Sequence, residues 1–246
     1  MARVSSVGLK EGGGPRGRTR MRREIEIKLP VHDARTLRRR LAELGFRRVS
    51  RRYFERNALF DFAGRALRKK GSLLRLRTEP GRSLLTFKGP RIGSGRFKER
   101  AEIEARLRDA AEVAGILESL GMEIAFRYEK YRTLYRRKAD PPHAEAAFDE
   151  TPIGTYLEIE GPKRWIDEVA QGLGYARREY ITASYGRLYL GWCKAHRQQA
   201  GDMVFRARVV ADKGPRRTDA ARRRTAGCLT REGPGAKVSK SASMDL

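Results

Sequence analysis

Several stretches of this 246-residue chain alternate strictly between charged and apolar residues. In residues 24–28, Glu24, Glu26 and Lys28 occupy every second position and isoleucines lie between them. Because successive side chains of a β-strand point to opposite faces, such a segment has one charged face and one apolar face. The pattern recurs in residues 74–77, 100–104 and 157–160, so we expect a sheet with two chemically different faces.

Strand-like and helix-like segments follow one another along the chain in an order that favours an antiparallel sheet. The Pro80-Gly81 pair between two strand-like segments is a hairpin signal. The alternating patterns predict strands in residues 24–28, 51–62, 72–79, 82–89, 97–106, 124–137, 144–150 and 155–161. Apolar residues at helical spacing predict helices in residues 33–44, 109–120, 163–172 and 182–196.

Eight antiparallel strands can close into a barrel that is just wide enough to hold a small ligand. The predicted fold class is therefore α+β, an eight-stranded closed antiparallel β-barrel with helices packed outside. The regular β–α alternation of a TIM barrel is absent. If the helices cover the apolar faces, the charged faces line a tunnel. For any single strand, an ordinary sheet with its charged face in water is the alternative.

The charge of the chain is strongly positive, with a formal net charge of +25 at pH 7. This predicts anionic partners. About half of the excess lies in two segments poor in apolar residues, which predicts a disordered basic extension over 1–22, a folded domain over 23–205 and a disordered basic tail over 206–246. Met21 is an alternative start. The basic segments are candidates for non-specific nucleic-acid contact.

The two cysteines, Cys193 and Cys228, form no metal-binding spacing and no disulfide scaffold. Their scarcity favours a reducing, cytoplasmic compartment. No apolar run approaches the ~20 residues that span a bilayer, so we expect no membrane segment.

Charged side chains inside a barrel need partners, because an unpaired buried charge is unfavourable. Carboxylates are suitable ligands for Mg²⁺ or Mn²⁺, and arginine and lysine are suitable for phosphate oxygens. A metal together with a polyphosphate would therefore satisfy such a tunnel. Mutual salt bridges in an empty tunnel are the alternative.

The charged strands resemble, in order, the motifs of the CYTH domain, the family of triphosphate tunnel metalloenzymes. Residues 24–28 resemble its ExExK signature, residues 74–77 its LRxR strand, residues 85–89 its TxKG strand and residues 100–104 its RxExE strand. The remaining matches are the KxR of 130–132, the aspartate at 149 followed by the ExE of 158–160, and the Ser-Tyr pair of 184–185. Residues 55–57 and Asp61 look closest to the bacterial class IV adenylyl cyclase branch.

The resemblance implies roles for individual residues. The metal ligands would be Glu24, Glu26, Asp149, Glu158 and Glu160, with Glu102 and Glu104 as a second metal site or as partners that orient the basic residues. The triphosphate would be held by Lys28, Arg75, Arg77, Lys88, Arg100, Lys130 and Arg132, and Tyr185 would either contact the ligand or pack. Glu24, Glu26, Lys28 and Lys88 would carry the catalytic roles.

Three functions remain open at this point. The first is metal-dependent hydrolysis of a triphosphate such as tripolyphosphate, ATP or thiamine triphosphate. The second is a class IV type adenylyl cyclase, in which the 3′-hydroxyl of ATP attacks the α-phosphorus and pyrophosphate leaves. The third is a module that binds polyphosphate or nucleic acid without chemistry. Barrels of this kind can pair, so a homodimer is a further expectation.

Overall fold

The computed structural model describes residues 21–205, and the basic extension and tail expected at the two ends lie outside this range apart from Met21 and Arg22. Eight strands form the wall of a closed antiparallel barrel. They are β1 (Arg22–Pro30), β3 (Tyr53–Phe62), β4 (Leu73–Glu79), β5 (Arg82–Arg91), β6 (Lys98–Leu107), β7 (Met122–Arg136), β8 (Glu145–Thr151) and β9 (Gly154–Glu160).

The sheet closes into a barrel because β7, near one end of the strand order, also pairs with β8 at the other end. β1 pairs with β6 on one side and with β9 on the other, and β7 pairs with both β3 and β8. A two-residue strand, β2 (Arg47–Arg48), pairs with the end of β7. The predicted turn at Pro80-Gly81 joins β4 and β5, in which Glu79 pairs with Arg82. The predicted α+β barrel is therefore confirmed.

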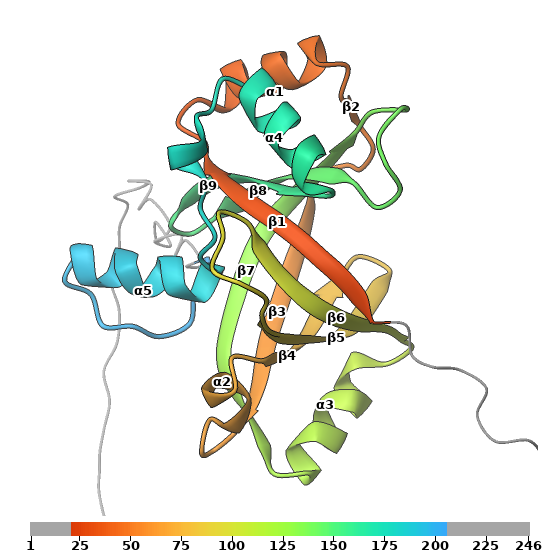
Figure 1. The fold of residues 1–246 in the computed structure, drawn as a ribbon. Helices are drawn as coiled ribbons and strands as arrows, with labels where there is room; N and C mark the ends of the chain where they lie inside the picture. Colours follow the sequence, from red (N-terminus) through yellow and green to blue (C-terminus); the bar gives the residue numbers. More distant parts are fainter. Residues whose placement is uncertain (1–20, 206–246) are drawn as a thin grey trace, which may run out of the picture. The chain divides into compact units, whose positions relative to one another are not determined.

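Two helices cover the outer face of β1, β8 and β9. They are α1 (Ala34–Glu43) and α4 (Lys163–Gly172), which lie side by side at the top of Figure 1. Their apolar residues share a core with Ile27, Leu29 and Phe148, whose side chains point out of the barrel. Burial of these residues determines which face of β1 points into the barrel. Its apolar side chains pack outward against the helices, so its charged side chains lie inside.

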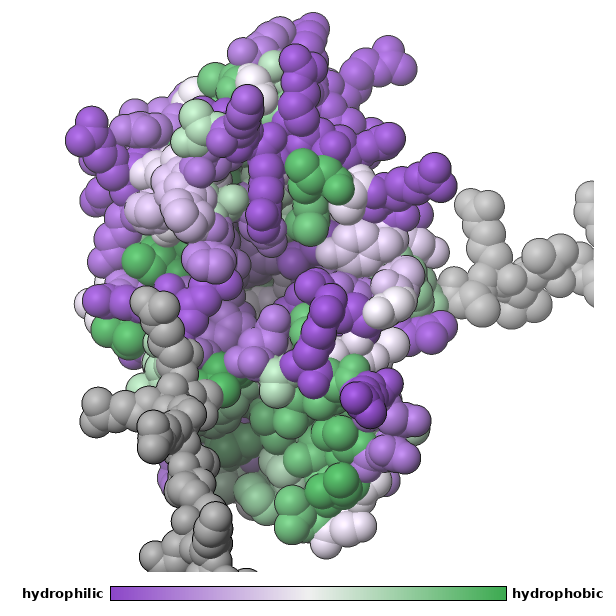
Figure 2. All heavy atoms as spheres, turned by 90° about the vertical axis from the view of Figure 1, so that its right-hand side faces the viewer, coloured by the Kyte–Doolittle hydropathy of each residue, from purple (hydrophilic) through white to green (hydrophobic). Residues whose placement is uncertain are grey.

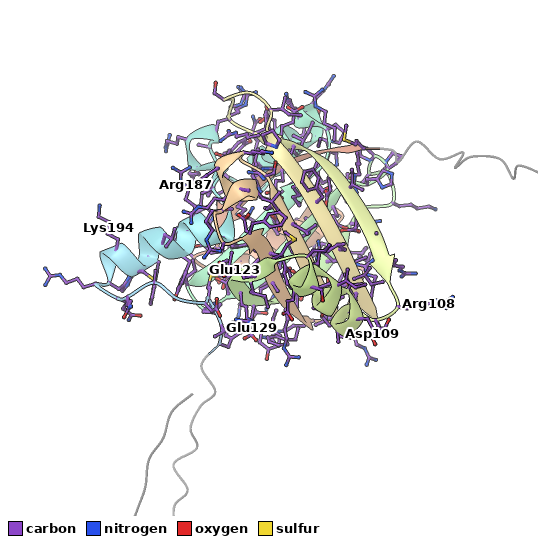
Figure 3. The ribbon with its side chains drawn as sticks, turned by 90° about the horizontal axis from the view of Figure 1, so that it is seen from below. Arg108, Asp109, Glu123, Glu129, Arg187 and Lys194 are labelled. Atoms are coloured by element: carbon purple, nitrogen blue, oxygen red, sulfur yellow. The ribbon has the colours of Figure 1, made fainter. Side chains whose placement is uncertain are left out.

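A second core lies under α3 (Ala110–Ser119) on the outer face of β3, β4 and β5. The side chain of Asp109 accepts hydrogen bonds from the backbone N–H groups of Ala111 and Glu112 and so caps this helix. Figure 3 shows Asp109 at the beginning of α3. The other face of α3 is exposed at Ile116 and Leu120.

The end of the barrel near Tyr128 and Tyr156 is covered by α5 (Tyr185–Ala195), which projects to the left in Figure 1. Tyr185, at the N-terminus of this helix, is buried against both tyrosines, whereas Arg187 and Lys194 point outward (Figure 3). Within residues 21–205 no helix is long and apolar enough to cross a membrane.

Three short elements were not expected from the sequence, and the first of them is β2, described above. The single turn α2 (Ala66–Lys69) follows Asp61, whose carboxylate accepts hydrogen bonds from the N–H groups of Leu67 and Arg68 at 2.9 and 3.0 Å. The 3₁₀ turn Arg177–Glu179 precedes α5. Elements of two to four residues are too short to give a periodic signal.

Candidate functional site

The barrel encloses a cavity of about 250 Å³ whose lining is dominated by charged side chains. It opens where β1, β3, β5 and β8 begin and where the other four strands end. In Figure 2 hydrophilic side chains surround a hollow on this face, while apolar side chains gather below it. The lining residues are Arg22, Glu24, Glu26, Tyr53, Arg75, Arg77, Arg82, Lys88, Glu102, Glu104, Arg132, Leu134, Arg136, Glu145, Ala147, Glu158 and Glu160.

The inner face of β1 supplies two glutamates and a lysine, as its alternation predicts. Glu24 accepts a hydrogen bond from Lys88 of β5. Glu26 accepts one from Lys98 of β6 and another from Lys28 Nζ at 3.0 Å. Burial alone would raise the pKa of Glu24, but the ammonium groups of Lys88 and Lys98 lower it to about 2. Glu24 is therefore ionised at neutral pH.

The two glutamates of β9 differ in their surroundings. Glu158 lies 2.8 Å from Lys28 Nζ and is also bound by Arg132, so its pKa is lowered despite its burial. Glu160 pairs with Arg22 at the mouth and faces Glu26 in the strand register. Burial, and then the negative charge of Glu24, raise the pKa of Glu160 to about 8.

Asp149 is the fully buried centre of a second cluster. Arg132 donates to both of its carboxylate oxygens at 2.6 Å, and Lys130 donates to Oδ2 at 3.0 Å. The hydroxyl of Tyr185 donates to the same oxygen at 2.6 Å. The ring of Tyr185 also lies 5.0 Å from the ammonium groups of Lys28 and Lys130. In this arrangement Asp149 holds the basic side chains in place, and Tyr185 packs over them.

Four arginines have buried donors to which no residue of the described part of the chain gives an acceptor. One is Arg65, which lies in the link between β3 and α2, and the other three have such donor atoms inside the barrel. These atoms are Nε of Arg75, Nε of Arg77, and Nε and Nη1 of Arg100. Arg100 and Arg75 lie on the inner faces of β6 and β4. Because a buried N–H without a partner is unfavourable, these donors indicate a site for an anion with several oxygen atoms.

Most of the residues predicted for the site are brought together on the inner face. Glu102 is buried 3.7 Å from Lys88, and Glu104 is exposed at the mouth, where it accepts a hydrogen bond from Thr86. Lys28, Arg100, Lys130, Asp149 and Tyr185 do not line the cavity itself. Lys28, Lys130 and Asp149 lie deeper, under Tyr185.

Arg22, Arg82, Arg136 and Glu145 at the mouth were not assigned from the sequence, and neither were two buried charged residues of the inner face, Glu55 and Lys98. Glu55 is fully buried, with its carboxylate 3.5 Å from Lys130 Nζ and 4.0 Å from both Arg77 and Arg132. Lys98 is buried beside Glu26. The alternation of side chains along a strand could have indicated both buried residues. Lys98 lies two positions before Arg100 and Glu55 two positions before Asn57, so each pair shares a face of its strand.

The carboxylates offer oxygen ligands only, which fits a hard cation such as Mg²⁺ or Mn²⁺. Burial first, and then the negative charges of Glu24 and Glu26, raise the pKa of Glu160, so added positive charge beside Glu160 would favour its ionised form. In residues 21–205, however, no three acidic, histidine or cysteine side chains are gathered as a ready metal site. The lysine and arginine partners described above take up the carboxylate oxygens.

The inner face of the closed barrel thus combines carboxylates with arginine donors that have no acceptor within residues 21–205. Residues 22–181 match the family model of the CYTH domain, and the chain belongs to this family. A protein of Methanocaldococcus jannaschii that is named as a candidate adenylate cyclase is 30% identical over 138 residues, which cover 56% of this chain and 75% of the relative.

Solved structures show the same fold. A candidate adenylate cyclase from Vibrio parahaemolyticus aligns with a TM-score of 0.57 and 18% identity over 69% of this chain and 98% of its own. A protein of Hippeastrum aligns with a TM-score of 0.51 and 20% identity over 68% and 95% of the two chains. The latter is described as a candidate adenylyl cyclase with a dominant triphosphatase activity.

Proposed function

We propose that this protein is a divalent-metal-dependent enzyme that hydrolyses a triphosphate. The observation that carries the proposal is the set of buried donors of Arg75, Arg77 and Arg100 that have no acceptor within residues 21–205. They lie in the same barrel as four carboxylates with oxygen ligands for a metal. This combination suits a polyanion with a hard cation, and the Hippeastrum neighbour supports hydrolysis over cyclisation.

The residues divide the work between them. Glu24, Glu26, Glu158 and Glu160 would hold Mg²⁺ or Mn²⁺, which neutralises phosphate charge and lowers the pKa of a bound water. Lys28, Lys88, Lys130, Arg75, Arg77, Arg100 and Arg132 would hold the phosphate oxygens and stabilise the charge that develops during transfer. Asp149 orients Lys130 and Arg132 for this task. Positioning and charge neutralisation account for most of phosphoryl-transfer catalysis.

The reaction itself needs only water as a second substrate. Its oxygen attacks the terminal phosphorus, the bond from that phosphorus to the bridging oxygen breaks, and a proton is released. The second candidate function is a cyclase, which the name of the Methanocaldococcus relative favours. There the 3′-hydroxyl of ATP replaces water and attacks the α-phosphorus.

The test is to incubate the purified protein with tripolyphosphate, ATP or thiamine triphosphate, together with Mg²⁺ or Mn²⁺. Orthophosphate, pyrophosphate and cyclic AMP are measured in the same samples. We expect orthophosphate, and no turnover by the Glu24→Ala/Glu26→Ala variant. The matched control is Glu43→Ala, which removes a glutamate on the surface of α1 whose one ion pair within residues 21–205 is with Arg39. Cyclic AMP with pyrophosphate would instead identify a cyclase, and binding without turnover would leave a binding module.

A further inference from the structure

One wall of the cavity differs from the rest of its lining. Apart from Tyr53, Leu134 and Ala147, every residue that lines the cavity is arginine, lysine or glutamate. Tyr53 and Leu134 are half-buried and Ala147 is buried. The apolar wall is therefore partly open to a ligand.

The strand register makes the three residues neighbours. Leu134 of β7 pairs directly with Ala147 of β8. Tyr53 of β3 pairs with Arg132, which lies two positions before Leu134 on the same face of β7. Residues at such direct and diagonal positions of a sheet are in reach of an aromatic side chain. The three residues thus form one strip across β3, β7 and β8.

The strip lies at the mouth of the barrel, outside the deeper cations. Tyr53 is the first residue of β3, and Leu134 and Ala147 each lie two residues from the mouth end of their strand. Beyond them, Arg136 and Glu145 form an ion pair of 2.7 Å at the rim. Lys28 and Lys130 lie towards the opposite end, under Tyr185. A ligand that binds these cations by its phosphates would present its other end to the strip.

The size of the cavity also places an organic group at the mouth. A cavity of about 250 Å³ is smaller than the ~300–1,000 Å³ of pockets that enclose a whole organic ligand. The phosphates can occupy the charged interior, but a ring attached to them must lie near the opening. The ring of Tyr53 beside two aliphatic side chains suits a planar ring, whereas an inorganic polyphosphate could use only the hydroxyl of Tyr53.

We propose that Tyr53, Leu134 and Ala147 form a subsite for the base of a nucleoside triphosphate, with Arg136 and Glu145 as a donor and an acceptor at its edge. The proposal rests on the proposed function, because it assigns the phosphates to the cations of the barrel. It names nucleoside triphosphates, rather than inorganic tripolyphosphate, as the substrate class.

The experiment compares ATP with tripolyphosphate in the wild type, in Tyr53→Ala and in Tyr53→Phe. We expect the ratio of kcat/KM for ATP to that for tripolyphosphate to fall about tenfold in Tyr53→Ala, as for the loss of one base–aromatic stack. The ratio should return to the wild-type value in Tyr53→Phe, which keeps the ring. Leu134→Ala should lower the ratio in the same direction. Thermal melts check that each variant folds.

An unchanged ratio in Tyr53→Ala overturns the subsite, even if both activities fall together, because Tyr53 would then act only on the shared triphosphate. The proposed function is judged separately, from the turnover of tripolyphosphate and ATP by the wild type. If the wild type turns over neither, calorimetric affinities for ATP and tripolyphosphate in the wild type and Tyr53→Ala still decide the subsite. Equal losses of the two affinities, or none, would again overturn it.

Discussion

Replacing Glu55 by glutamine removes one negative charge from the centre of the barrel and keeps the shape of the side chain. The carboxylate is 0% exposed and lies between 3.5 and 4.0 Å from Lys130, Arg77 and Arg132. These cations lower the pKa of Glu55 against the effect of its burial, so it is ionised at neutral pH. In Glu55→Gln the negative charge that offsets the mutual repulsion of Lys130, Arg77 and Arg132 is lost.

The size of the effect follows from these contacts. A pair of unit charges 4 Å apart is worth ~4 kcal/mol at an effective dielectric constant of ~20, and desolvation of the carboxylate offsets much of the sum. Loss of one partner of a buried ion pair typically costs about 3–5 kcal/mol. For a protein of this size that corresponds to a fall in Tm of roughly 6–20 °C. Tripolyphosphate should bind more tightly, because its charge replaces the one removed.

Thermal melts in EDTA measure the stability, and titration calorimetry with tripolyphosphate measures the affinity. Glu43→Gln is the matched control, because the ion pair of Glu43 with Arg39, its one ion pair in the described part of the chain, is exposed and its loss should change the Tm little. In Glu55→Gln the Tm should fall while the affinity for tripolyphosphate rises. A fall in Tm below ~2 °C, equivalent to less than ~1 kcal/mol, would refute the reasoning that Glu55 compensates the cations.

Three further predictions concern single side chains. Burial and the charge of Glu24 raise the pKa of Glu160 to about 8, so deprotonation of this side chain destabilises the folded state. In EDTA, the Tm of the wild type should therefore fall relative to that of Glu160→Gln as the pH rises from about 4.5 to 8. Equal dependence of the two Tm values on pH would contradict this. Tyr185→Phe removes a buried hydrogen bond to Asp149 and should lower the free energy of unfolding by about 1.5–3 kcal/mol in denaturant titrations. Asp61→Ala uncaps α2 and should lower it by about 1–2 kcal/mol, and no change would mean that the turn is held by other contacts.

The alternation of charge predicted which side chains share a face of each strand, and the expectation that this face is the interior one depended on helices covering the other face. In β1 the isoleucines turn out to the core under α1 and α4, and this leaves Glu24, Glu26 and Lys28 only the inner face. The eight strands, the hairpin at Pro80-Gly81 and the four longer helices followed from periodicity and turn residues. The fold could therefore be predicted almost completely.

The partners of each charge could not be predicted in the same way. The pairing of Lys98 with Glu26 depends on the register between strands 72 residues apart in the sequence, and that of Arg132 with Asp149 depends on the register of the hairpin formed by β7 and β8. Asp149 was expected among the metal ligands by resemblance, and its contacts with Lys130, Arg132 and Tyr185 emerge only in three dimensions. Its role in metal binding stays a prediction.

The pairing of β1 also has a consequence for the nascent chain. Its partners, β6 (Lys98–Leu107) and β9 (Gly154–Glu160), are synthesised long after residues 22–30. At ~5–20 residues per second, β1 waits roughly 6–25 s before β9 has been made and can close the barrel. During that time both edges of β1 lack their partners until β6 is made, and the edge that pairs with β9 lacks its partner throughout, so that β1 could associate with other chains. Charges on alternate positions of a strand discourage such association, so Glu24, Glu26 and Lys28 would protect the growing polypeptide before they ever meet a ligand.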